Sequence, residues 1–112
     1  MGEEKDKVVH SELGSLIDTD ATDFREFCKD KDLGYLSSFH NLLVQTYNQV
    51  KDIKDQLVAK IKVERLSEDS EEKKILNGVY VKLLLTEEKV FIVRDIIKSR
   101  KLEDWFRLTW QS

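Results

Sequence analysis

Two apolar series with a seven-residue period restrict what this chain can fold into. The first series is Leu36, Leu43, Val50 and Leu57, with Phe39, Tyr47, Ile53 and Ile61 between its members. The second series is Leu76, Leu83, Val90 and Ile97, with Val79 and Val93 between its members. Such spacing gathers apolar side chains on one face of a helix that packs lengthwise against another helix. The two series predict two long helices, over about 35–66 and about 69–100.

The connection between the two predicted helices is short. Residues 67–70 (Ser-Glu-Asp-Ser) interrupt the apolar pattern, and Asp69 followed by Glu72 has the spacing of a capping box that starts a helix. Because short connections join antiparallel neighbours, the sequence predicts an all-α antiparallel hairpin or bundle. The absence of proline from all 112 residues agrees with this fold class, since proline breaks helix interiors.

Two features of the second long helix leave alternatives open. Thr86 followed by two glutamates has the composition of a helix N-terminus, so the helix is either continuous or broken near Thr86. Asn77 and Gly78, followed by the apolar run 79–85, also fit a β-hairpin turn and a strand. No alternating partner strand precedes Asn77, so a helix is favoured over a strand.

The N-terminal third predicts one or two short helices laid against the hairpin. Residues 8–17 have an amphipathic pattern, and Asp20 or Thr22 is placed to cap a second helix that runs to about Asp30. Residues 32–34 (Asp-Leu-Gly) have the composition of a turn. The second short helix carries three apolar side chains on one side: Phe24, Phe27 and Cys28.

Length, charge and cysteine content narrow the class of protein. The polar residues 1–7 are expected to be disordered, and residues 8–112 are expected to form a single helical domain. A net charge of −3 argues against a strongly basic nucleic-acid binder. A single cysteine cannot form a disulfide within the chain. Because neither a membrane-spanning run nor a secretory signal is found, the expected location is intracellular, cytoplasmic or nuclear.

The residues able to do chemistry do not form a catalytic pattern. His10 and His40 lack ligand-spaced neighbours, and Cys28 sits on the apolar side of a predicted helix. Asp52 and Asp55 share a helix face, but lysines surround them, which is typical of a solvated surface. The four glycines are scattered and make no phosphate-binding loop. We therefore expect no enzyme activity, no cofactor and no metal site.

The C-terminal segment contains both tryptophans of the chain within six residues. Large rigid aromatic side chains dominate the energetics of protein interfaces. The segment packs over the open end of the hairpin, or it docks a protein partner or a second copy of the chain, as a homodimer. Both can hold together, with one indole in the core and one exposed. The leading prediction is a non-enzymatic helical interaction or assembly subunit, whose partner-binding residues are Leu102, Trp105, Phe106 and Trp110.

Basic residues near the C-terminus give the alternative prediction. Lysine and arginine contact phosphates, and nearby tryptophans stack on bases. Such a segment fits a helical accessory subunit of a nucleic-acid-processing complex, for example in DNA replication. The candidate phosphate contacts are Arg94, Lys98, Arg100 and Lys101.

The order of helices resembles a known family over residues 36–100. A long helix, an acidic connection with Glu71 and Glu72, and a second helix carrying Arg94, Ile96 and Lys98 are similar to the helical domain of GINS-type replication subunits. The resemblance implies a non-catalytic scaffold around a helicase. It rests on order and spacing, and the chain has no room for the small β-rich domain that such subunits also carry. We do not assign the chain to that family.

Overall fold

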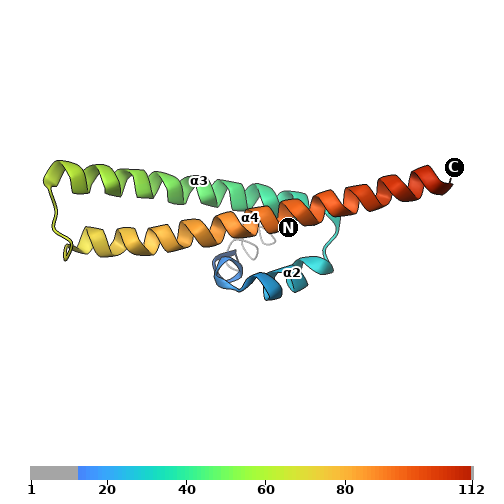
Figure 1. The fold of residues 1–112 in the computed structure, drawn as a ribbon, viewed down its shortest axis with the longest axis horizontal. Helices are drawn as coiled ribbons and strands as arrows, with labels where there is room; N and C mark the ends of the chain where they lie inside the picture. Colours follow the sequence, from blue (N-terminus) through green and yellow to red (C-terminus); the bar gives the residue numbers. More distant parts are fainter. Residues whose placement is uncertain (1–12, 112) are drawn as a thin grey trace, which may run out of the picture.

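The protein is an antiparallel helical hairpin with short helices packed against one end (Figure 1). The structure, a computed structural model, describes residues 13–111, and the side chains within them as far as residue 109. Residues 13–18 are helical and are followed by three helices: α2 (Ala21–Lys29), α3 (Leu33–Glu64) and α4 (Glu71–Gln111). The all-α prediction is confirmed, while the prediction of a disordered segment 1–7 lies outside the described residues.

The two long helices lie side by side and run in opposite directions (Figure 1). Arg65 ends α3 in the left-handed conformation, with φ 52°, and its backbone N–H donates to the Ile61 carbonyl. A turn closed by Ser70 N–H and the Ser67 carbonyl (3.1 Å) then leads into α4. The Ser70 hydroxyl accepts a hydrogen bond from the Lys73 N–H (3.2 Å) and caps α4. The predicted cap at Asp69 is therefore wrong by one residue, because the turn carries the chain to Ser70 before α4 begins.

Aspartate side chains start both helices at the other end of the molecule. The Asp20 carboxylate accepts from Asp23 N–H (2.8 Å), which confirms Asp20, not Thr22, as the cap of α2. The Asp32 carboxylate accepts from Tyr35 N–H (2.7 Å) and caps α3. The prediction of a turn at residues 32–34 is wrong, because this cap lets α3 begin at Leu33 and places Gly34 in its first turn.

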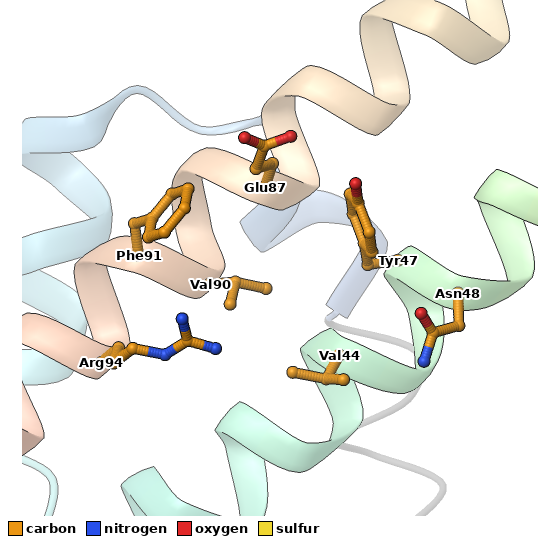
Figure 2. A pocket seen from close by; sticks show the side chains of 7 residues that line it. All are labelled: Val44, Tyr47, Asn48, Glu87, Val90, Phe91 and Arg94. Atoms are coloured by element: carbon orange, nitrogen blue, oxygen red, sulfur yellow. The ribbon is translucent and has the colours of Figure 1, made fainter.

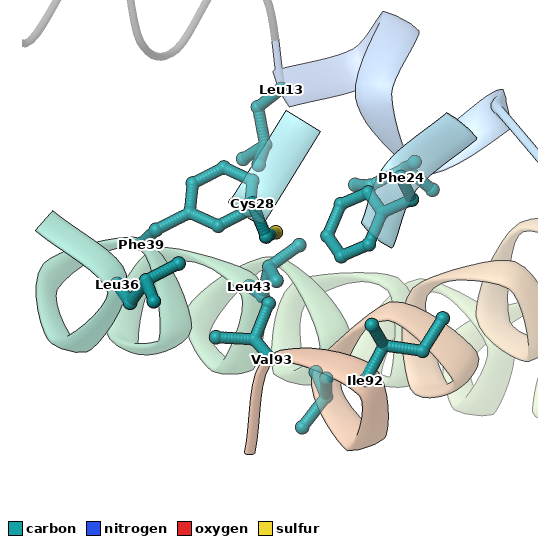
Figure 3. Close-up of a cluster of buried hydrophobic side chains, with 10 residues drawn as sticks. Leu13, Phe24, Cys28, Leu36, Phe39, Leu43, Ile92 and Val93 are labelled. Carbon is teal, nitrogen blue, oxygen red and sulfur yellow. The ribbon is translucent and has the colours of Figure 1, made fainter. Parts of the chain in front are cut away.

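The main core lies where α2 and the helical residues 13–18 cover the hairpin (Figure 3). Side chains from every described helix meet there. Farther along the hairpin, Leu57 and Ile61 of the first apolar series are only half-buried, and Ile53 is 48% exposed. Two helices alone cannot enclose their shared seam, so full burial occurs only where a third element covers it. The buried cluster consists of Leu13, Ile17, Phe24, Cys28, Leu36, Phe39, Leu43, Val90, Ile92 and Val93.

Aromatic rings join α2 to the start of α3. The Phe24 and Phe39 rings are stacked with centroids 5.9 Å apart, and Phe27 lies 5.9 Å from Phe39 in a tilted arrangement. The Lys31 ammonium sits 4.8 Å above the Phe27 ring and 5.3 Å from the Tyr35 ring. These contacts fix α2 across the hairpin, since aromatic pairs of this geometry add to the stability gained from burial alone.

The centre of α4 is continuous through Thr86, so the predicted alternative of a break there is wrong. The buried Thr86 hydroxyl donates to the Lys82 carbonyl (2.7 Å) one turn earlier and does not cap a new helix. Gly78 and residues 79–85 all lie within α4, so the strand alternative for residues 79–85 is also wrong. A Cβ at Gly78 would meet no neighbouring atom. Lys89, one turn after Thr86, is also buried, with 0% of its surface exposed, and its Nζ pairs with Glu88 Oε1 (2.8 Å).

The last turns of α4 extend past the other described helices (Figure 1). With 41 residues against 32 in α3, α4 is the longer helix of the hairpin, and the molecule measures 66 Å along its longest axis. The predicted helix end near residue 100 is wrong, because α4 runs to Gln111 and includes the aromatic segment. The sequence after Gly78 holds neither proline nor glycine that would stop it.

Candidate functional site

The aromatic residues near the C-terminus lie on the projecting part of α4. Leu102 is 52% exposed, Trp105 57% and Phe106 50%. Trp105 and Phe106 meet edge to face, with ring centroids 5.1 Å apart. The alternative in which this segment packs over the hairpin is wrong for these three residues, because α3 begins at Leu33 and no other described helix lies beside them. The side chain of Trp110 lies outside the described residues.

The same side of α4 is apolar and exposed far beyond the predicted segment. Leu84 and Phe91 precede Trp105 at multiples of seven residues, and Val81 precedes Leu102 in the same way, so all lie on one side of the helix. We call this side the outer face of α4. The sequence pattern does not single out the first half of this face, because it predicts a buried seam through Leu83 and Val90, which are the neighbours of Leu84 and Phe91 in the chain. The outer face includes Tyr80, Val81, Leu84, Phe91, Leu102, Trp105 and Phe106, all between 43% and 67% exposed.

A groove of about 340 Å³ lies between α3 and α4 (Figure 2). Phe91 lines the groove and belongs to the outer face, so the groove adjoins that face. Polar groups from both helices surround its apolar floor, and the Arg94 guanidinium lies 5.8 Å from the Phe91 ring. The volume is at the lower end of small-ligand pockets. The lining residues are Val44, Tyr47, Asn48, Glu87, Val90, Phe91 and Arg94.

His40 lies on α3, one turn before Val44. Its Nε2 is buried and meets no hydrogen-bond partner within the described part of the chain. Burial of the imidazole, with a smaller contribution from the positive charge of Arg94, lowers the pKa of His40 below its ordinary value of 6.5. Folding therefore favours the neutral form of the His40 imidazole over the protonated form.

This lowered pKa predicts a loss of stability on acidification. Because the unfolded chain binds a proton on His40 at a higher pH than the folded chain, the free energy of unfolding falls as pH drops through 6.5. We expect the wild type to lose stability relative to His40→Gln between about pH 7.5 and 5.5. Urea denaturation of both proteins across this range measures the difference, and a pH-independent difference would contradict the prediction.

Three of the four candidate phosphate contacts share one side of α4. Arg94, Lys98 and Lys101 are exposed at spacings of four and three residues. Arg100 lies on the opposite side and is occupied: its Nη2 donates to the Cys28 carbonyl (3.1 Å) and to the Lys29 carbonyl (2.7 Å). Its Nη1 donates to a third carbonyl, that of Lys31. Arg100 therefore caps the C-terminus of α2 and is corrected from a phosphate contact to a structural residue.

Cys28 packs in the core, as the apolar side of its helix predicted. Its side chain is buried, and desolvation raises the pKa of the thiol from 9.0 to about 11, although the nearby Arg100 acts in the opposite direction. A rise of this size leaves roughly 100-fold less thiolate, which is the nucleophilic form.

The state of Cys28 gives a second prediction, on chemical modification. At about pH 8 we expect iodoacetamide to alkylate the native protein at least roughly 100-fold more slowly than the unfolded chain, since both thiolate population and access are reduced. Mass spectrometry of quenched time points measures both rates. Comparable rates in the native and unfolded states would show that Cys28 is not buried.

The acidic candidates do not converge. Asp52 and Asp55 are exposed on α3, and Asp55 pairs with Lys54 (2.9 Å). Within residues 13–111, no three His, Cys, Asp or Glu side chains come close enough together to hold a metal ion. His10 lies outside the described residues.

None of the helices that the structure describes combines the length and apolarity needed to cross a membrane. Comparison of the chain with protein-family models, with curated proteins and with solved structures found no match.

Proposed function

We propose that this protein is a non-enzymatic helical interaction or assembly subunit, which docks a protein through the projecting end of α4. One observation carries the proposal: Leu102, Trp105 and Phe106 are each at least half exposed on a helix that extends past every other described element. A small helical domain gains no stability from aromatic side chains in this position. Their burial against another protein would be strongly favourable.

The geometry of these residues supports docking. A helix holds their backbone rigid, so binding orders only side-chain rotamers and costs little conformational entropy. Trp105 and Phe106 already contact each other, which reduces that cost further. Tryptophan and arginine are the residue types most enriched in interface hot spots, and Arg107 follows directly in the same helix.

The alternative, a nucleic-acid-binding accessory subunit, has less support. Arg100 is occupied at the end of α2, so three basic residues remain of the four. Asp95 is exposed among them and opposes contact with phosphate. A binding assay at increasing salt separates the alternatives, because phosphate contacts weaken steeply with salt whereas contacts between apolar side chains do not.

The proposed function predicts a variant that binds poorly but folds normally. Replacing Leu102, Trp105 and Phe106 with alanine should leave helicity unchanged and alter stability by no more than about 0.5 kcal/mol per site, since all three are exposed. Binding should weaken at least about 30-fold, as expected for loss of a hot spot. The measurement is affinity capture of proteins, including a second copy, on immobilised wild-type and variant chains, with circular dichroism.

Leu108→Ala is the matched control. Leu108 is 72% exposed on the same projecting turns but faces another side of α4 than Leu102. It should keep binding unchanged. If the triple variant captures the same proteins as wild type, with equal affinity, the proposed docking end is wrong. If the triple variant unfolds, the three residues belong to the core.

A further inference from the structure

We propose that the outer face of α4 binds the outer face of a second copy in antiparallel orientation, forming a symmetric dimer. This inference rests on the proposed function and deepens it, because it identifies the partner. The two-fold axis of this dimer passes α4 at the level of residue 93. Residues equally far before and after 93 in the two copies then face each other.

The order of side chains along the outer face carries the inference. One row at seven-residue spacing is Leu84, Phe91, Lys98 and Trp105, and the adjacent row is Val81, Glu88, Asp95 and Leu102. All eight side chains are exposed. Both ends of the face are apolar. Its middle carries Glu88 before residue 93, and Asp95 and Lys98 after it. Two adjacent rows with this period form the seam of a coiled coil.

An antiparallel second copy matches this order in chemistry as well as in position. Leu84 and Leu102 both lie nine residues from 93, so each meets the other in the second copy. Glu88 and Lys98 both lie five residues away, which pairs opposite charges twice in the dimer. The Glu88 carboxylate, 48% exposed, would then lie between Lys98 of the second copy and the buried Lys89 of its own chain, with which its Oε1 already pairs (2.8 Å). The remaining facing pairs, also formed twice, are Val81 with Trp105, Tyr80 with Phe106, and Phe91 with Asp95.

Other arrangements of two copies match less well. In a parallel in-register pair, Lys98 would meet Lys98 and Glu88 would meet Glu88, and like charges repel. In the antiparallel pair shifted by one heptad towards the C-terminus, Lys98 meets Asp95, but Trp105 then faces Glu88. In the opposite shift, Lys98 faces Val81 and Leu84 faces Asp95. The register centred on residue 93 also sets one apolar side chain of the two rows, Phe91, against the carboxylate of Asp95. Of these arrangements it is the one that keeps both apolar ends together and pairs Glu88 with Lys98.

Within residues 13–111, no helix covers this face along its length. The buried residues of α4, such as Val93 and Lys89, point to the side covered by α3 and α2, opposite to Phe91 and Leu102. From Tyr80 to Phe106 the face is about 39 Å long at 1.5 Å per residue. Residue 93 lies near the middle of α4, so the projecting end of each copy would cover the exposed side chains within residues 80–84 of α4 in the other.

A charge exchange tests both the dimer and its register. We expect wild type to sediment as a dimer at micromolar concentration, and Lys98→Glu to raise the dissociation constant at least about tenfold, because the introduced carboxylate would then face Glu88 of the second copy. Mixing Lys98→Glu chains with Glu88→Lys chains should restore a heterodimer. Asp95→Lys chains mixed with Lys98→Glu chains should not. Analytical ultracentrifugation measures all four samples, and circular dichroism checks that each variant is helical.

Disulfide trapping gives a second measurement that does not disturb the Glu88–Lys89 ion pair. Chains with Leu84→Cys mixed with chains with Leu102→Cys should crosslink under mild oxidation, whereas Phe91→Cys with Leu102→Cys should not. The inference is overturned if wild type is monomeric, if Asp95→Lys restores binding, or if the Phe91–Leu102 pair crosslinks instead. A monomer that still captures another protein through Leu102, Trp105 and Phe106 would leave the proposed function standing.

Discussion

Phe24→Ala is expected to destabilise the protein by about 3–5 kcal/mol, the range for removing a fully buried phenylalanine. The Phe24 side chain is 0% exposed at the junction of α2, α3 and α4, and its ring stacks on Phe39 at 5.9 Å. The ammonium of the buried Lys89 also lies 5.8 Å from this ring. Loss of the ring leaves a cavity where α2 packs against α3 and α4. Urea denaturation followed by circular dichroism measures the free energy of unfolding.

The effect of Phe24→Ala should begin locally. Since Cys28 belongs to the same buried cluster, its alkylation rate should rise in the variant, which reports separation of α2 from the hairpin. Val63→Ala is the matched control, because Val63 is 83% exposed on α3 and should change stability by less than about 0.5 kcal/mol. A loss below about 1 kcal/mol for Phe24→Ala would show that α2 is not packed as described.

Arg100→Ala is expected to cost about 1.5–3 kcal/mol, the range for hydrogen bonds made by a charged group. One guanidinium group donates to the carbonyls of Cys28, Lys29 and Lys31. These carbonyls lie at the end of α2, where the helix itself supplies no further donors. The Lys31 N–H donates to the Cys28 carbonyl (3.1 Å), and the Arg100 guanidinium adds donors to all three carbonyls. Chemical denaturation measures the total loss, and amide hydrogen exchange should show it concentrated in α2.

The shape of the guanidinium group matters as well as its charge. Arg100→Lys keeps the charge but loses the planar fork that reaches several carbonyls at once, so it should restore only part of the stability. Lys101→Ala, at the exposed neighbouring position, is the control and should be near neutral. Equal stability of Arg100→Ala and wild type would show that these hydrogen bonds contribute nothing.

The core and the outer face use different sides of the same helix. Val90 and Val93 of α4 pack in the core with residues of α2 and α3, and the exposed Phe91 lies between them in sequence. Loss of docking and loss of folding are therefore separable by mutation on α4. This separation lets the proposed dimer be tested without unfolding the protein.

The heptad series determined the hairpin from sequence alone. Leu36, Leu43 and Val90 were placed on the seam by their spacing, and each is buried in the structure. The caps were harder to predict, because several adjacent residues can each accept the needed hydrogen bond. The sequence correctly predicts Asp20 as one of two candidate caps of α2, but it predicts Asp69 where Ser70 caps α4, and a turn where Asp32 caps α3. Local composition does not distinguish a cap from a turn, since both use the same side-chain acceptors.

The helical fold, the antiparallel pairing and the aromatic C-terminal segment can be predicted from the chain alone, because they follow from the period and composition of neighbouring residues. Which candidate residues remain available for binding depends instead on how the helices pack. Arg100 and Lys101 are neighbours in sequence, yet Arg100 caps α2 and Lys101 faces outward. Trp105 is exposed because α3 begins at Leu33 and does not reach the projecting turns of α4. Burial depends on what packs beside a residue, which is set by helices distant in sequence.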